Sequence, residues 1–377
     1  MKIAVNTRLL LKGKMEGIAV HAFNVLKLIT VAHPEHQFLF LFDRPYNEEF
    51  IFSDNITPIV LMPQARHPIL FYWWFELSVG RLLRQSKPDL FYSPDGFLSL
   101  SANTPSISVM HDINYEYYPD DLPKMALWYY KHYFPKFMAK ASHILTVSEF
   151  SKQDIVKTYK IDPAKIDVVY NGADDAYRKL NEEEKTAVKQ KYSNGKDYFV
   201  YVSALHPRKN VKRLLEAFDK MKESTGADIK LILVGPAYFK NSDMMNVYEQ
   251  MKHKQDVIFT GRLEVNELCK VVGAAFAMAY ISYFEGFGIP IIEAMRCEVP
   301  VITSNVTSMP EVAGDAALLI DPFSVDSMAD GLTKLFKDNS LRQGLIEKAS
   351  LRKNVFTWDR TANLTWTAIE KTLEQCR

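Results

Sequence analysis

The sequence lacks the features that mark disulfide-rich, zinc-binding and membrane-spanning proteins. Its three cysteines, Cys269, Cys297 and Cys376, are far apart and form no C-x-x-C pair, which argues against a disulfide framework or a zinc site and favours a reducing compartment. No apolar run approaches the roughly 20 residues of a membrane span. Asn6 and Arg8 interrupt the first apolar run before a signal-peptide core forms. We therefore expect a soluble cytoplasmic protein.

A surplus of charge is also missing. The chain has 46 basic and 45 acidic residues, so no global field attracts nucleic acid or an anionic membrane, and we expect no nucleic-acid partner. Its 377 residues exceed one ordinary domain, and a chain of this length is expected to form about two or three domains.

Short apolar segments alternate with helical patterns, such as those over 18–30, 69–85 and 124–141. Several of the segments are apolar on both faces, as in a covered parallel sheet. In the first half they are KIAVNTR, HQFLFLFD, ITPIVLM, PDLFYSP, PSISVMHD, HILTVS and IDVVYNG. In the second half they are YFVYVSAL, IKLILVG, DVIFTGRL, AFAMAYIS, VPVITSN and ALLIDP.

This alternation predicts an α/β fold of two Rossmann-like, doubly wound parallel-sheet domains. The polar interval from about 173 to 196 is the expected connection between them. We expect one domain over residues 1–180 and a second over 181–357, followed by a final helix over about 358–377. A cleft between two such domains is the usual place for a ligand.

The stretch YFEGFGIPIIEAM sets two carboxylates around a glycine-containing turn between a strand and a helix. Gly286 and Gly288 permit unusual backbone angles, and Pro290 suits a first helical turn. The helix N-terminus predicts an anion site. Glu293 is expected in the first turn, ionised and binding a ribose, whereas Glu285 faces the far side of the anion. The alternative is a structural turn in which the glutamate only complements the helix dipole.

Arg208 and Lys209, in the stretch SALHPRKNVKRLLEAF, follow the first strand of the second half. Two adjacent cations at the carboxyl end of a strand suit a diphosphate, although a solvated basic turn would have the same sequence. The loop around Gly286 is not a dinucleotide fingerprint, because G-x-G-x-x-G would require glycine at Ile291.

Together HPRKN, EGFGIPIIEAM, PVITSNVTSMPEVAGDAALLIDP and FTWDRTA resemble the retaining nucleotide-sugar glycosyltransferases of the GT-B type, group 1 or family 4-like. GIAVHAFNVL, VMHDINYEYYP, LTVSEFSKQDI and VVYNGAD resemble the corresponding blocks of the first half. The resemblance implies an acceptor-side first domain, a donor-binding second domain and a final helix that crosses back to the first. It also implies a hexosyltransferase of polysaccharide or lipopolysaccharide assembly.

The resemblance also implies site residues. Arg208 and Lys209 would bind the donor diphosphate, Glu293 the ribose and Glu285 the transferred sugar, with His111 near its reacting face. The loop residues Gly286, Phe287, Gly288 and Ile289 would contact sugar and phosphate, Arg262 and Leu263 would hold the base, and Gly17 would close over the phosphates. Ala19 and His21 depart from the family pattern, which puts acceptor-side contacts in doubt.

The chemistry expected of this site needs no metal, because fixed cations and helix amides stabilise the leaving diphosphate. No D-x-D pair suggests a bound magnesium ion. GDP-mannose is the preferred donor, with UDP-linked sugars as alternatives, and the acceptor is a saccharide or a lipid-linked sugar. Two other functions stay open: a hydrolysing nucleotide-sugar epimerase and a binding protein without turnover.

Two aromatic stretches, PILFYWWFELSVGRLL and LPKMALWYYKHYFPKFMAK, allow two interpretations. They are core helices, or they lie on the inner face of a membrane as a peripheral contact. The sequence favours the core interpretation.

Overall fold

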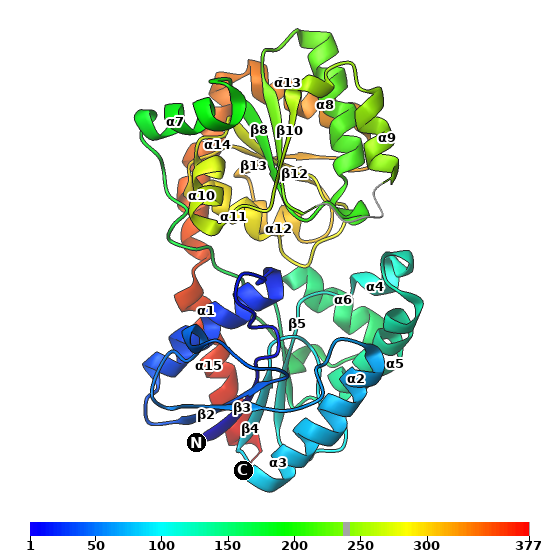
Figure 1. The fold of residues 1–377 in the computed structure, drawn as a ribbon, viewed down its shortest axis with the longest axis vertical. Coiled ribbons are helices and arrows are strands. Elements are labelled where there is room, and N and C mark those ends of the chain that lie inside the picture. Colours follow the sequence, from blue (N-terminus) through cyan, green and yellow to red (C-terminus); the bar gives the residue numbers. More distant parts are fainter. Residues whose placement is uncertain (237–241, 377) are drawn as a thin grey trace. The chain divides into compact units, whose positions relative to one another are not determined.

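The computed structural model describes residues 1–236 and 242–376. The chain forms two compact units: unit 1 comprises Met1–Gly172 and the segment from Trp358 onward, and unit 2 comprises Ala173–Thr357. Each unit is a parallel sheet with helices on both faces (Figure 1). The expected α/β fold with two Rossmann-like domains is confirmed.

Unit 1 contains a seven-stranded parallel sheet with the order β3-β2-β1-β4-β5-β6-β7. Every residue of β4, β5 and β6 is buried, as expected for a sheet covered on both faces. Its strands are β1 (Lys2–Asn6), β2 (Gln37–Phe42), β3 (Ile56–Val60), β4 (Leu90–Ser93), β5 (Ser106–Met110), β6 (His143–Thr146) and β7 (Ile166–Val168).

The helices of unit 1 cover both faces of this sheet, with α1 and α15 on one side and α2 and α5 on the other (Figure 1). The final helix, α15, packs against α1, where Trp366 stacks on His33 at a centroid distance of 3.7 Å. The helices are α1 (Gly17–Ala32), α2 (Pro68–Tyr72), η2 (Trp73–Val79), α3 (Gly80–Ser86), α4 (Asn114–Tyr117), α5 (Lys124–Lys140), α6 (Glu149–Tyr159) and α15 (Trp358–Gln375).

Unit 2 contains a six-stranded parallel sheet with the order β10-β9-β8-β11-β12-β13. Its strands are β8 (Tyr198–Val202), β9 (Lys230–Val234), β10 (Val257–Gly261), β11 (Ala277–Tyr280), β12 (Val301–Ser304) and β13 (Ala317–Ile320). Its helices are α7 (Glu182–Ser193), η5 (Pro207–Lys209), α8 (Val211–Thr225), α9 (Ser242–Gln250), α10 (Val265–Gly273), α11 (Ile289–Arg296), α12 (Met309–Ala313), α13 (Val325–Lys337) and α14 (Asn339–Arg352).

Two segments differ from the simplest sequence interpretation. The helix expected over 69–85 is a continuous helical run in which the middle part, η2, is a π-helix. The polar interval over 173–196 contains α7, whose N-terminus carries a capping box between Asn181 and Glu184. This interval therefore forms part of unit 2 and is not a linker without structure.

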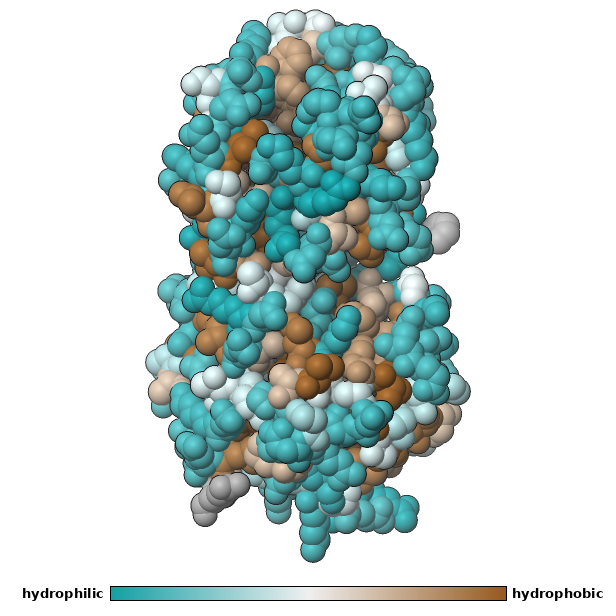
Figure 2. Space-filling view, turned by 90° about the vertical axis from the view of Figure 1, so that its left-hand side faces the viewer, coloured by the Kyte–Doolittle hydropathy of each residue, from teal (hydrophilic) through white to brown (hydrophobic). Residues whose placement is uncertain are grey.

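Hydrophilic residues cover most of the face shown in Figure 2, with smaller hydrophobic areas scattered among them. Among the described helices, none is long and apolar enough to cross a membrane.

Candidate active site

The strand order of unit 2 reverses between β8 and β11. These strands are neighbours in the sheet, and the chain winds outward in one direction from β8 and in the other from β11. The loops that follow them therefore diverge, and ligands of open α/β sheets bind at such a point. The loop after β8 contains η5, and residues 281–288 form the loop after β11.

The side chains of Arg208, Lys209 and Glu285 meet at this edge of the sheet. Lys209 Nζ lies 2.5 Å from Oε1 of Glu285, and Arg208 Nη1 lies 3.1 Å from Oε2. Arg208 also donates to the carbonyl of Phe284 at 3.1 Å. The Tyr280 hydroxyl donates to Oε1 of Glu285 at 2.8 Å. The structure thus joins three predicted site residues in one hydrogen-bonded network.

The network keeps Glu285 ionised although its side chain is only 8% exposed. Burial raises the pKa of this carboxyl group, but the charges of Lys209 and Arg208 outweigh burial and lower the pKa of Glu285 to about 2. Two cations around one carboxylate leave an excess of positive charge. That excess, on a guanidinium and an ammonium group, suits a phosphate ligand.

Hydrogen bonds to backbone carbonyls fix both loops. Ser308 Oγ donates to the carbonyls of Glu285 and Phe287, each at 2.9 Å. Asn210 Nδ2 donates to the carbonyl of Ile281 at 3.0 Å and so ties the loop after β8 to the loop after β11. The network is therefore held before any ligand arrives, which reduces the reorganisation that binding requires.

The start of α11 agrees with the expected anion-binding geometry. Gly288 has φ +107°, a conformation that L side chains rarely adopt, and Pro290 lies in the first turn. A Cβ atom at Gly288 would also lie 3.1 Å from Cδ1 of Ile291. The backbone over 287–289 thus stands at the positive end of α11, where anions are favoured.

Glu293 differs from its prediction in position and in charge. Since α11 begins at Ile289, Glu293 is its fifth residue and lies in the second turn, not the first. Its carboxyl group is half-buried and hydrogen-bonds to the hydroxyl of Tyr177. Burial raises the pKa of Glu293 to about 7, although the Tyr177 hydrogen bond acts in the opposite direction. The first-turn position was wrong, and a pKa of about 7 makes Glu293 partly protonated at neutral pH, because burial disfavours the ionised form.

Arg262 and Leu263 follow β10, where Gly261 has φ +69°. Arg262 is exposed and Leu263 is half-buried. The amide of Gly235, after β9, donates to the carbonyl of Gly261 at 2.9 Å. A Cβ atom at Gly235 would lie 1.9 Å from the carbonyl oxygen of Ser203, after β8, so only glycine fits there. Base binding by Arg262 and Leu263 stays a prediction.

In unit 1, the predicted residues Gly17 and His111 lie on different elements. Gly17 is the exposed first residue of α1, and His111 follows β5. His111 Nε2 donates to the carbonyl of Pro94 at 2.9 Å, which leaves Nδ1 as an acceptor when the ring is neutral. Burial lowers the pKa of His111, against the opposing effects of that carbonyl and of Asp112 and Asp95. The neutral ring is therefore the main form near neutral pH.

His21, where the sequence departs from the family pattern, packs edge-on against His111 with ring centroids 5.0 Å apart. It is fully buried, and its Nδ1 lies 2.8 Å from Oδ1 of Asn171. Burial, together with the charge of His111, lowers the pKa of His21 to about 3. His21 is thus a neutral ring that packs against His111.

Sequence reasoning missed a second charged network, at the strand-order reversal of unit 1. Arg8 follows β1, Asp95 follows β4, and these strands are neighbours. Arg8 Nε lies 2.7 Å from Oδ2 of Asp95, and Asn6 Nδ2 donates to Oδ1 at 2.7 Å. The Arg8 guanidinium also lies over the ring of Phe97, 4.5 Å from its centroid. The rule that located Glu285 would have found this pair if applied to unit 1.

Comparison with known proteins identifies the family. The Glycosyltransferase Family 4 pattern matches residues 15–177, and the Glycosyl transferases group 1 pattern matches residues 182–352. The chain is 30% identical over 304 residues to the O-antigen chain mannosyltransferase B of Escherichia coli, which covers 80% of both chains. The chain belongs to the group 1 glycosyltransferases. As a member, it is an enzyme, and the epimerase and non-catalytic alternatives are set aside.

Other similar proteins agree with this glycosyltransferase assignment. The O-antigen chain mannosyltransferase RfbU of Salmonella typhimurium is 31% identical over 271 residues, 71% of each chain. WaaG, a glycosyltransferase involved in lipopolysaccharide biosynthesis, has a TM-score of 0.75 at 18% identity, covering 96% of this chain and 98% of WaaG. HepE of Anabaena, solved with UDP-glucose, has a TM-score of 0.77 at 17% identity, covering 98% and 100%. At these identities the solved structures support the GT-B fold alone.

Among the described residues, one group has the ligand types and spacing of a metal site: His33, Glu35 and His36, whose ligand atoms all lie within 4.8 Å of one another. This group follows α1 in unit 1, where the rings of His33 and His36 stack on Trp366. The Glu285 network belongs to unit 2, so the group is not part of it. Donor chemistry without a metal stays a prediction.

Proposed function

We propose that this glycosyltransferase is a retaining enzyme that transfers a mannosyl residue from GDP-mannose to a saccharide or lipid-linked acceptor in O-antigen or related polysaccharide assembly. The network of Arg208, Lys209 and Glu285 at the β8–β11 reversal carries the proposal. The choice of sugar and pathway is supported by the names of the relatives at 30% and 31% identity.

Arg208 and Lys209 are assigned to the donor diphosphate. Breaking the anomeric bond develops negative charge on the leaving nucleoside diphosphate, and preorganised cations stabilise that charge. Both side chains already lie in fixed positions against Glu285. The start of α11 supplies the oriented amides over 287–289 that would share the phosphate oxygens.

Glu285 is assigned to the transferred sugar. Its low pKa keeps it anionic throughout the neutral range, so it accepts hydrogen bonds from sugar hydroxyls and stabilises the positive charge that develops at the anomeric carbon. Its two oxygens already accept from Lys209, Arg208 and Tyr280. A group bonded to three donors is a poor nucleophile, which favours same-face attack with the leaving phosphate as base.

Glu293 and His111 are assigned supporting contacts. Glu293, with a pKa of about 7, holds a ribose hydroxyl in either protonation state, since a protonated carboxyl donates and an ionised one accepts. His111 would contact the sugar's reacting face as a neutral ring whose Nδ1 is an acceptor.

Nucleoside diphosphate release from a panel of GDP-, UDP- and ADP-sugars, with chelator present, tests the proposal. We expect selective turnover of GDP-mannose, loss of turnover in Lys209→Met, and unchanged turnover in the matched control Lys220→Met. Lys220 forms an exposed ion pair with Asp326 in the same unit. Retention is read from the anomeric configuration of the product by NMR. Preference for a UDP-sugar would overturn the donor assignment, and loss of activity with chelator would overturn the metal-free mechanism.

A further inference from the structure

Unit 1 exposes large apolar side chains on two neighbouring helical segments. Trp128 is 59% exposed, and Tyr72, the least exposed of the group, 42%. We call this surface the aromatic patch. Its members are Ile69, Tyr72, Trp73 and Leu77 of α2 and η2, and Met125 and Trp128 of α5.

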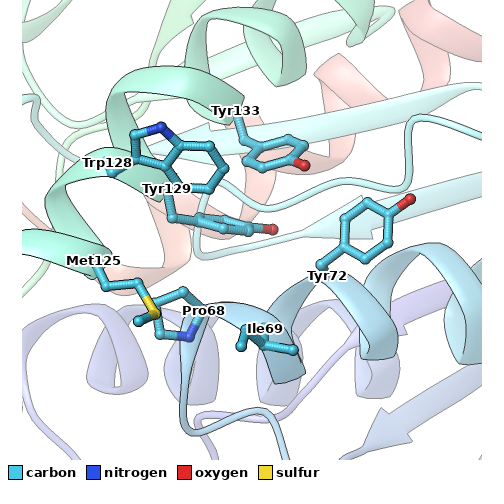
Figure 3. A pocket seen from close by; sticks show the side chains of 7 residues that line it. All are labelled: Pro68, Ile69, Tyr72, Met125, Trp128, Tyr129 and Tyr133. Atoms are coloured by element: carbon cyan, nitrogen blue, oxygen red, sulfur yellow. The ribbon is translucent and has the colours of Figure 1, made fainter.

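The two parts of the aromatic patch border a hollow between α2 and α5, which contact each other. Figure 3 shows Ile69 and Tyr72 on one side of it and Trp128 and Tyr133 on the other. The cavity has a volume of about 200 Å³, and its walls are apolar apart from tyrosine hydroxyls. It is lined by Pro68, Ile69, Tyr72, Met125, Trp128, Tyr129 and Tyr133. Its size and walls suit an aliphatic chain.

Core packing does not account for these side chains. The opposite faces of the same helices already enter the core of unit 1, where Trp74 and Phe137 are almost fully buried. Ile69, Trp73 and Leu77 recur at every fourth position and form a single exposed stripe. The core interpretation of these stretches therefore holds for one face of each helix, and the other face is exposed.

Positive charge is in excess around the aromatic patch, although Lys131 is ion-paired with Glu116 at 3.4 Å and Asp120 and Asp121 precede α5. Over the helical segments 68–86 and 124–140, the only acidic residue is Glu76, which is buried and accepts from the amides of Leu100 and Ser101. The cations on the same segments are Arg81, Arg84, Lys124, Lys131, Lys136 and Lys140. The whole chain is near neutral at +1, so these helices are a local concentration of positive charge.

Some of these cations border the aromatic patch directly. Lys124 adjoins Met125 in sequence, and Lys131 is one helical turn from Trp128. Lys136 Nζ lies 5.5 Å from the ring centroid of Tyr133, which lines the hollow. Exposed tryptophan and tyrosine rimmed by lysine are typical of a surface at a lipid headgroup layer. A protein interface of this size would instead be depleted in lysine.

We propose that the aromatic patch docks unit 1 onto an anionic lipid bilayer. The lysines and arginines contact the headgroups, Trp73 and Trp128 sit at the interface, and an acyl chain enters the hollow between α2 and α5. Attachment is peripheral. This inference does not depend on which donor or acceptor the enzyme uses, since it concerns residues outside the Glu285 network.

Flotation of the full chain with vesicles tests the docking. One vesicle set is phosphatidylcholine, and the other is an equal mixture of phosphatidylcholine and phosphatidylglycerol. We expect binding to the anionic set only, weakening as salt rises. Trp73→Gln with Trp128→Gln should weaken binding by at least about tenfold, from lost apolar burial. Lys124→Gln with Lys136→Gln should weaken it by about thirtyfold, from two lost headgroup contacts.

Leu351→Gln is the matched control, since Leu351 is a 75% exposed apolar residue of unit 2; it should bind vesicles like the wild type. Circular dichroism and nucleoside diphosphate release in vesicle-free buffer show that each variant is folded. Absence of vesicle binding by the wild type, or equal binding by the double tryptophan variant, would overturn the proposal. So would a concentration-dependent dimer without lipid that these tryptophan changes abolish, because it would assign the aromatic patch to a second copy of the chain.

Discussion

Replacing Glu285 by glutamine separates donor binding from catalysis. The amide keeps the size of the side chain but removes the charge that Arg208 and Lys209 share. The positive charge of both cations is then no longer offset by the Glu285 carboxylate. A diphosphate should therefore bind Glu285→Gln at least as tightly as it binds the wild type, whereas turnover should fall by orders of magnitude, because the charge at the anomeric carbon loses its stabilising carboxylate.

The same substitution should also lower the free energy of unfolding, by an amount that follows from the pKa of Glu285. The pKa of Glu285 is about 2 in the folded chain against an ordinary 4.5, which at about 1.4 kcal/mol per pH unit corresponds to about 3 kcal/mol. Because the folded pKa is depressed, this stabilisation is present above about pH 4.5 and is lost as the pH falls toward 2. Wild type should therefore be more stable to unfolding than Glu285→Gln at neutral pH, and the two stabilities should become equal in acid.

Glu267 provides the control. Its pKa is also lowered to about 2, mainly by hydrogen bonds from Lys191 and Tyr192, but its side chain is 36% exposed. Solvent screens such a pair, so Glu267→Gln should cost at most about 1 kcal/mol. Denaturant unfolding by circular dichroism and GDP titration by calorimetry measure the two effects. If Glu285→Gln lost GDP binding as fully as Lys209→Met does, the separate roles assigned to these residues would be refuted.

Three further predictions concern unit 2. Gly235→Ala should destabilise the chain by several kcal/mol, because its Cβ would lie 1.9 Å from the Ser203 carbonyl; Gly344→Ala, with open space around it, should be neutral or stabilising in the same denaturant titration. Glu293→Gln should unfold at a higher denaturant concentration than wild type at about pH 8 but not at about pH 4. The raised pKa of Glu293 makes wild-type stability fall as the pH rises from the ordinary pKa of 4.5 to about 7. An equal difference between the two proteins at both pH values would contradict this. Tyr280→Phe should cost about 1 kcal/mol and reduce turnover without changing GDP affinity, and a matching loss of GDP affinity in calorimetry would count against its role through Glu285.

The fold and the place of the candidate site in it could be predicted from the sequence because both depend on local patterns. Each expected strand segment contains a strand in the described residues. The left-handed Gly288 and the position of Pro290 follow from backbone restrictions that hold in any context. The loop around Glu285 could be placed because the carboxyl ends of parallel strands share one edge.

Contacts across the sheet and burial were beyond sequence reasoning. The local sequence does not show that Arg208 and Lys209 bond to Glu285, because Arg208 is 77 positions and Lys209 76 positions from it. The pKa of Glu293 depends on how deeply α11 is covered and on Tyr177, which comes from the segment before α7. The π-helix η2 could not be predicted either, because π-helices are rare and the residue pattern over 69–85 does not distinguish one from an α-helix.

Hydrogen exchange of the full chain with and without GDP tests most directly whether the donor diphosphate binds at the β8–β11 reversal. The account predicts slower exchange at the amides of 208–210 and 284–289, and no change in these segments for Lys209→Met. Binding of GDP by the wild type without protection of either segment would place the donor elsewhere and contradict the assignment of Arg208, Lys209 and the start of α11.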